Sequence, residues 1–233
     1  MSDAKTGRPP QPSRREGAPR ASTHANVAGR ERELRAMADA VRRLVRVTIN
    51  NTADARWTAD AAERIHALAD ALAPAVPETP PPRYGMLRAP ERPDDIFPYD
   101  PVQGLYNPLA LPVEMSWEPP CAIGHATFDT PYEGPPGCVH GAVLAAAFDQ
   151  VINVANILSG AAGPTASLAL DYKRPTPLHA PLVFEARVEG VDGRKIRSRA
   201  LVRCGDAVTV EARGLFIAVD RERVMRLAGD EER

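Results

Sequence analysis

The chain has 233 residues, 44% of them hydrophobic, which is enough to bury one core with appendages. Its 29 basic and 30 acidic residues give a formal net charge of -1, which excludes the strongly basic surface that nucleic acids select. No run of 18 apolar residues occurs, so we expect no membrane-spanning segment.

The cysteines and the N-terminal composition predict a cellular compartment. Cys121, Cys138 and Cys204 are isolated and odd in number, which is typical of reduced thiols and of neither a disulfide framework nor a zinc site. The first residues are rich in Arg and Pro and lack an apolar stretch, so they resemble neither a secretory nor a twin-arginine signal. We therefore expect a cytoplasmic protein without a metal ion or cofactor.

Composition divides the first half of the chain into three segments. Residues 1–28 are mostly Pro, Arg, Ser and Gly and predict a disordered tail. Residues 29–75 show helical periodicity in two stretches and predict a helical extension, whose second helix runs from Thr58, as N-cap, to Leu72. Residues 76–105 are rich in proline, which lacks a backbone donor, and predict a linker.

The second half predicts one α+β domain at residues 106–220, followed by a charged tail at residues 221–233. A long apolar helix is expected from Gly141 to about Leu158. Turn signals such as Asp192-Gly193 separate stretches of alternating polarity. These stretches predict strands at residues 115–118, 121–128, 165–172, 182–191, 195–204 and 207–219. One long helix followed by an antiparallel meander predicts a curved sheet wrapped around that helix.

The apolar helix carries one acid, Asp149, the only charged residue between Gly141 and Leu170. A carboxylate in such a stretch is costly to bury unless it is paired or used, which makes Asp149 the first candidate for chemistry. Gly141 and Asp149 are eight positions apart, or roughly 12 Å along a helix, and point to different sides. A site that uses both residues must take one of them from a second copy of the chain.

Three motifs carry a resemblance to a known family. Residues 134–142 read G-P-P-G-C-V-H-G-A, close to G-x-P-G-x-x-H-G-G, with an acid nine positions after the histidine. Residues 165–178 end in Y-K-R-P-T-P-L, close to Y-x-R-P-x-P, and residues 189–195 supply the hairpin E-G-V-D-G-R-K. Over roughly residues 100–220 the chain resembles the hotdog-fold thioesterase superfamily, in its phenylacetate-degradation and THEM-type acyl-CoA branch.

The resemblance implies an acyl-CoA thioesterase that works as a homodimer or tetramer. The amide of Gly141, at a helix N-terminus, would polarise the thioester carbonyl. Asp149 of the partner subunit would be the general base or the nucleophile, His140 would shape the loop and help place the carbonyl, and Thr165 would hold the attacking water. The departure from the family pattern is Ala142, where a second glycine is usual.

Outside the helix, Lys173 and Arg174 follow a predicted strand and could meet the phosphates of coenzyme A, or could be a solvated strand end. The helix and loop residues also have structural interpretations. Asp149 could join a polar stripe with Asn153 and Asn156. His140 could be a core histidine, and Thr165 an ordinary strand residue.

Two other functions stay open at this point. A non-catalytic acyl-CoA-binding or scaffold protein is suggested by Ala142 and by the N-terminal extension. An enoyl-CoA hydratase of the same fold would need a D-x-N-x-x-H signature, which the sequence lacks.

Overall fold

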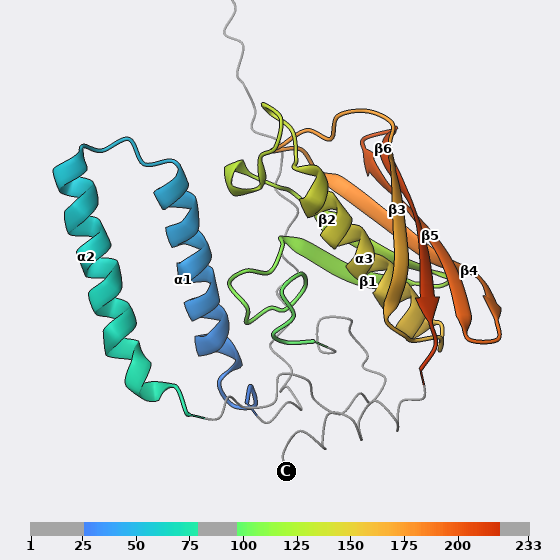
Figure 1. Ribbon diagram of the computed structural model, residues 1–233, viewed down its shortest axis with the longest axis horizontal. Coiled ribbons are helices and arrows are strands. Elements are labelled where there is room, and N and C mark those ends of the chain that lie inside the picture. The colour runs from blue at the N-terminus through green and yellow to red at the C-terminus, as the bar shows by residue number, and fades with distance from the viewer. Residues whose placement is uncertain (1–25, 79–96, 220–233) are drawn as a thin grey trace, which may run out of the picture.

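A computed structural model describes residues 26–78 and 97–219 of the chain (Figure 1). The tails predicted at residues 1–28 and 221–233 lie wholly or mostly outside these ranges, and so do residues 79–96 of the predicted linker. All of the predicted helices and strands fall within the described residues.

The described residues form one antiparallel sheet of six strands, in the order β1-β2-β4-β5-β6-β3, which leaves β1 and β3 at its edges. The helices are α1 (Glu31–Ile49), α2 (Ala55–Leu72), the short 3-10 helices η1 (Ala73–Ala75) and η3 (Thr130–Tyr132), and α3 (Gly141–Leu158). The strands are β1 (Val113–Glu118), β2 (Cys121–Ala126), β3 (Thr165–Tyr172), β4 (Leu182–Asp192), β5 (Lys195–Cys204) and β6 (Ala207–Ile217). The predicted α+β class is confirmed.

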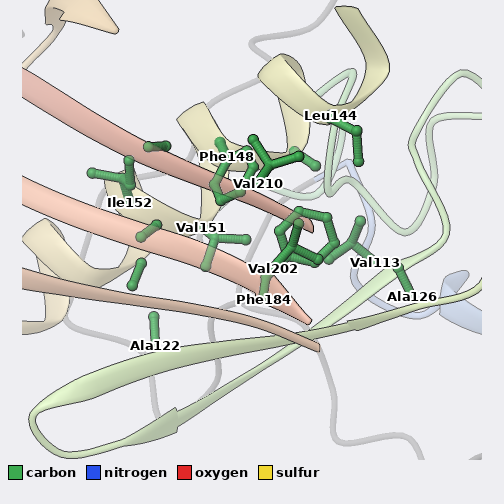
Figure 2. Close-up of a cluster of buried hydrophobic side chains, with 14 of the residues drawn as sticks. Val113, Ala122, Ala126, Leu144, Phe148, Val151, Ile152, Phe184, Val202 and Val210 are labelled. Atoms are coloured by element: carbon green, nitrogen blue, oxygen red, sulfur yellow. The ribbon is translucent and has the colours of Figure 1, made fainter. Parts of the chain in front are cut away.

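The core lies between α3 and the sheet, which curves around this helix (Figure 1). Phe148 of α3 meets Phe184 of β4 edge-on, with ring centroids 5.2 Å apart. Figure 2 shows Val151 and Ile152 on the same helix, pointing toward the strands among valines such as Val202. All five side chains are fully buried, so α3 is fixed to the sheet by close packing along much of its length.

Length and mean hydropathy alone would allow α3 to cross a membrane, and it is the one such helix in the described ranges. Half of it is buried inside the structure. A core helix meets the same two criteria, so this is weak support for a membrane span.

The start of α2 differs from the sequence prediction. The helix begins at Ala55, and Asp54 is the N-cap, with its carboxylate accepting from the Trp57 amide at 2.8 Å. Thr58 lies inside the first turn and donates its hydroxyl to the Asp54 carbonyl. Thr58 as N-cap is therefore wrong, because an aspartate three residues before Trp57 satisfies the free amides of an earlier first turn.

The extension is attached to the rest of the molecule through α1. The Arg42 guanidinium donates to the Asn107 carbonyl at 2.6 Å, and Arg46 pairs with Asp129 just before η3. The second helix α2 has no buried residue and follows α1 through a short turn (Figure 1).

Candidate active site

The loop before α3 is held on both sides by backbone hydrogen bonds. The Val139 amide donates to the Thr176 carbonyl at 2.8 Å, and the Leu178 amide donates to the Gly137 carbonyl at 2.9 Å. Gly137 has a φ of 73°, which favours glycine. Its amide donates to the Glu133 carboxylate at 2.7 Å. These contacts fix the path of the chain into α3.

The 3-10 helix η3 supports the loop from the side of α1. Tyr132 stacks edge-on against Phe128, with ring centroids 5.3 Å apart. Burial raises the pKa of the Tyr132 phenol, and the Asp129 carboxylate raises it further, so this side chain stays neutral. The Tyr132 carbonyl accepts from the backbone amide of His140 at 2.8 Å.

His140 is the N-cap of α3. Its Nδ1 accepts from the Ala142 amide at 3.0 Å, and its carbonyl accepts from the amides of Val143 and Leu144. In the neutral imidazole the proton must therefore lie on Nε2, which has no hydrogen-bond partner in the part of the chain that the structure describes. The side chain is exposed, so His140 is not a core histidine.

The remaining amide of the first turn, that of Gly141, makes no hydrogen bond with any residue that the structure describes. The Tyr172 hydroxyl donates to the Gly141 carbonyl at 2.9 Å and would lie 3.1 Å from a Cβ atom at this position. Glycine thus lets Tyr172 approach the helix start. An unpaired amide at a helix N-terminus is a donor for an oxygen that carries negative charge.

Eight residues further along α3, Asp149 is half-buried and accepts at Oδ1 from the Thr165 hydroxyl, at 2.7 Å. Its second oxygen, Oδ2, makes no hydrogen bond within the described residues. Asn156 is fully buried and accepts instead from Ser198 of β5 at 2.6 Å. Asp149 is therefore paired with β3 rather than with the asparagines of its own helix.

Strand β3 thus contacts α3 at both candidate positions, through Thr165 at its first residue and Tyr172 at its last. The sequence identified Thr165 but gave Tyr172 no role. The only signal for Tyr172 was its place at the end of a strand in the Y-K-R-P motif.

The two basic residues after β3 differ in their surroundings. The Lys173 ammonium pairs with Glu211 at 3.4 Å, and both side chains are about half exposed. Arg174 is exposed, and its guanidinium has no partner among residues 26–78 and 97–219. Within the same ranges no group of three or more His, Cys, Asp or Glu side chains could hold a metal ion.

A curved antiparallel sheet around one central helix, with an unpaired helix-start amide and one acid on that helix, defines a hotdog-type domain. The chain matches the family model described as thioesterase superfamily over residues 136–211. It is 35% identical to a thioesterase superfamily protein of known crystal structure, with a TM-score of 0.70 over 79% of this chain and 94% of that chain. The chain belongs to the thioesterase superfamily.

Two curated relatives match shorter segments. Acyl-coenzyme A thioesterase THEM4 of Xenopus laevis is 36% identical over 90 residues, which cover 37% of this chain and 40% of that protein. Acyl-coenzyme A thioesterase THEM5 of Homo sapiens is 29% identical over 92 residues, which cover 39% of this chain and 37% of that protein. The matched segment therefore spans about two fifths of the length of these relatives.

Proposed function

We propose that the protein is an acyl-CoA thioesterase whose site is shared between two copies of the chain. Water adds its oxygen to the thioester carbonyl carbon, the carbon–sulfur bond breaks, and the thiolate of coenzyme A leaves and takes up a proton. The products are a free acid and coenzyme A. Family membership supports thioester chemistry, and the names of the THEM4 and THEM5 relatives support acyl-CoA as the substrate class.

The observation that carries the proposal is the unpaired amide of Gly141. The amides of His140, Ala142, Val143 and Leu144 are all occupied, so Gly141 alone among them can donate to a substrate. As the thioester carbonyl becomes tetrahedral, its oxygen gains negative charge, and this fixed donor and the helix dipole stabilise it. His140 Nε2–H is a second donor beside the same turn.

Asp149 supplies the other half of the chemistry. The Thr165 hydroxyl donates to Oδ1, and no described residue bonds Oδ2, so Oδ2 is available to an incoming group. Asp149 either takes a proton from the attacking water or attacks the carbonyl carbon itself. A single turnover in ¹⁸O-water tests for the nucleophile route. The base route puts the label in the first acid released. In the nucleophile route an acyl–Asp149 anhydride forms as the thiolate leaves, and water that attacks the Asp149 carboxyl carbon of this anhydride puts the label in Asp149.

The two groups belong to different copies in this mechanism. Gly141 and Asp149 lie at the first and ninth residues of α3, roughly 12 Å apart along its axis, which is too far for one thioester carbonyl. The strand β3 supports the presence of a second copy, because it is an edge strand with no buried residue. Its unpaired backbone groups are a template for another chain, next to Asp149 and Thr165. A homodimer is the smallest assembly that completes the site.

The first test is hydrolysis by Asp149→Asn and Asp149→Ala. Both variants are expected to lose turnover while keeping the thermal unfolding profile of the wild type, because Asp149 contacts Thr165 on an exposed strand and is not part of the core. The measurement is thiol release from acyl-CoA substrates of several chain lengths. Hydrolysis at the wild-type rate by either variant would remove Asp149 from the mechanism.

The same assay addresses the rival functions. Ala142 in place of the second family glycine favours a non-catalytic acyl-CoA binder, which would bind the panel and release no thiol. A hydratase would consume enoyl-CoA without freeing thiol.

Arg174 is the better candidate of the two basic residues for the phosphates of coenzyme A, since Lys173 is already paired with Glu211. We infer a cytoplasmic location from the three free cysteines.

A further inference from the structure

The helical extension exposes two apolar stripes that nothing in the described structure covers. Met37, Val41 and Val45 of α1 and Trp57, Ile65, Leu68 and Leu72 of α2 recur at helical spacing, and we call these seven residues the hairpin stripe. Trp57 is 59% exposed and Leu68 is 58% exposed. Of the two helices, only Ala38 is buried. A short turn joins α1 and α2 (Figure 1), and the two helices do not bury each other's stripes.

Helices of this length gain little stability from an apolar face that stays in water. An isolated helix in water gains little from propensity alone, and in proteins its stability comes from burying an apolar face. Seven large side chains that are each about half exposed present on the order of 600 Å² of apolar surface. That equals the upper range of the largest patch on a typical monomer and approaches the roughly 800 Å² that one partner gives to a standard interface.

The position of α1 connects the hairpin stripe with the candidate site. Arg46 pairs with Asp129, which precedes η3, and the η3 residue Tyr132 accepts the backbone N–H of His140. The C-terminal half of α1 therefore lies beside the loop that presents the Gly141 amide. In the two-chain site of the proposed function this loop faces the partner subunit, so α1 lies next to the region where the second copy would dock.

We propose that the hairpin stripe packs against the second copy in the dimer that completes the site. This inference rests on the two-chain site of the proposed function. A lipid surface fits less well, because membrane-surface helices carry a strongly basic polar face. The charges of the two helices nearly balance: α1 has five arginines against three acids, and α2 has two arginines against three acids. The hairpin therefore offers anionic headgroups little net attraction.

The test compares two double substitutions of the full-length chain that place the same charges on opposite faces of α2. Ile65→Glu/Leu68→Glu falls on the hairpin stripe, and the control Ala59→Glu/Ala67→Glu falls on the charged face. Sedimentation equilibrium measures the dimer dissociation constant. We expect the stripe variant to raise this constant at least 100-fold, because four buried apolar side chains are lost per dimer, and the control to change it less than about 3-fold.

A second measurement does not depend on how well the charged variants fold. In a Trp117→Phe background Trp57 is the only indole in the chain. Its emission should be blue-shifted at concentrations where the dimer forms and should move to the wavelength of an exposed indole on dilution. An equal dissociation constant for the stripe variant and its control, or an emission that stays at the exposed wavelength throughout, would overturn the inference.

Co-sedimentation with phosphatidylcholine and phosphatidylserine vesicles, seen for the wild type and lost in the stripe variant, would also overturn it and assign the stripe to lipid. The test of the hairpin stripe and the test of the proposed function can fail independently of each other. If Asp149→Asn remains active while the stripe variant dissociates, the mechanism fails and the interface stands. If Asp149→Asn is inactive and the stripe variant stays dimeric, the mechanism stands and the interface fails.

Discussion

Two hydroxyl groups of β3 make hydrogen bonds to the two candidate residues of α3. Thr165 holds one oxygen of Asp149, and Tyr172 holds the carbonyl of Gly141. Gly141 is the first residue of α3, where carbonyl and amide share a short, tightly turned segment. A hydrogen bond to the carbonyl therefore limits the directions in which the neighbouring amide can point, and this makes Tyr172 a positioning residue.

Replacing Tyr172 with phenylalanine removes that hydrogen bond and keeps the ring. Since one hydrogen bond contributes about 1 kcal/mol, we expect kcat to fall about 5-fold to 10-fold. KM should change little, because the amide acts mainly on the charge that develops in the transition state. Steady-state thiol release measures both constants. Ser167→Ala, another exposed hydroxyl of β3, is the control and should leave both unchanged. A raised KM with wild-type kcat would instead place the Tyr172 ring in substrate binding.

His140 acts as an N-cap through an unusual acceptor, its Nδ1 atom. His140→Ala should lower the free energy of unfolding by about 1 kcal/mol, the usual loss when a helix cap is removed. Asparagine is a favoured cap, so His140→Asn should recover most of this loss. Urea denaturation at one fixed protein concentration measures the difference, since dimerisation contributes to stability. Equal stability of the alanine and asparagine variants would show that the cap contributes nothing.

At the scale of elements, the position of both candidate groups depends on how firmly α3 is packed into the sheet. Phe184 of β4 is fully buried and stacks on Phe148 of α3. Phe184→Ala should reduce the free energy of unfolding by about 3 to 5 kcal/mol, because it leaves a cavity under the helix. Leu109→Ala, at a side chain that is 73% exposed, should change it by less than about 0.5 kcal/mol. Chemical denaturation of both variants tests this, and a loss below 1 kcal/mol for Phe184→Ala would contradict it.

Most of these elements could be predicted from local patterns. The bounds of β3 and β5 agree with the alternating stretches at residues 165–172 and 195–204, because each stretch ends at a turn signal. The predicted start of α2 was wrong because Asp54 and Thr58 are both residue types that favour an N-cap, and the helical periodicity does not distinguish between them. The pairing of β3 with β6 and the order of the strands depend on long-range contacts that one sequence does not display.

The candidate site was partly predictable for a similar reason. Gly141 and Asp149 stand out locally, as a glycine after a histidine and a lone acid in an apolar helix. Tyr172 does not, because its role depends on β3 crossing α3 so that its hydroxyl meets a helix carbonyl. The exposed stripe of α2 is visible in its periodicity, yet only the structure shows that no described residue covers it.

At the scale of the whole molecule, the similarity to the superfamily member of known structure reaches beyond the hotdog domain. Similarity over 79% of the chain is more than residues 106–220 can supply, so the match includes residues before the hotdog domain. An extension that packs on a second copy would link assembly with activity, because the same contact that buries α2 would bring Gly141 and Asp149 of opposite subunits together.

A single substitution can remove the N–H donor of Gly141 and change little else in the helix. Proline is favoured at the first position of a helix, and His140, at φ -61° and ψ 135°, has the extended conformation that a residue before proline requires. Gly141→Pro should therefore keep the helix, delete the N–H donor and lower kcat about 10²-fold to 10³-fold. Gly141→Ala adds the same Cβ beside Tyr172 but keeps the donor, so it should lose far less.

Mixing Gly141→Pro with Asp149→Asn tests the shared site most directly. Each variant is inactive by itself, but a mixed dimer contains one site with an intact Gly141 from one chain and an intact Asp149 from the other. If the chains exchange at random, half of the dimers are mixed, and thiol release should recover to roughly a quarter of the wild-type rate. If each site lay within a single chain, every mixture of the two variants would stay as inactive as its components.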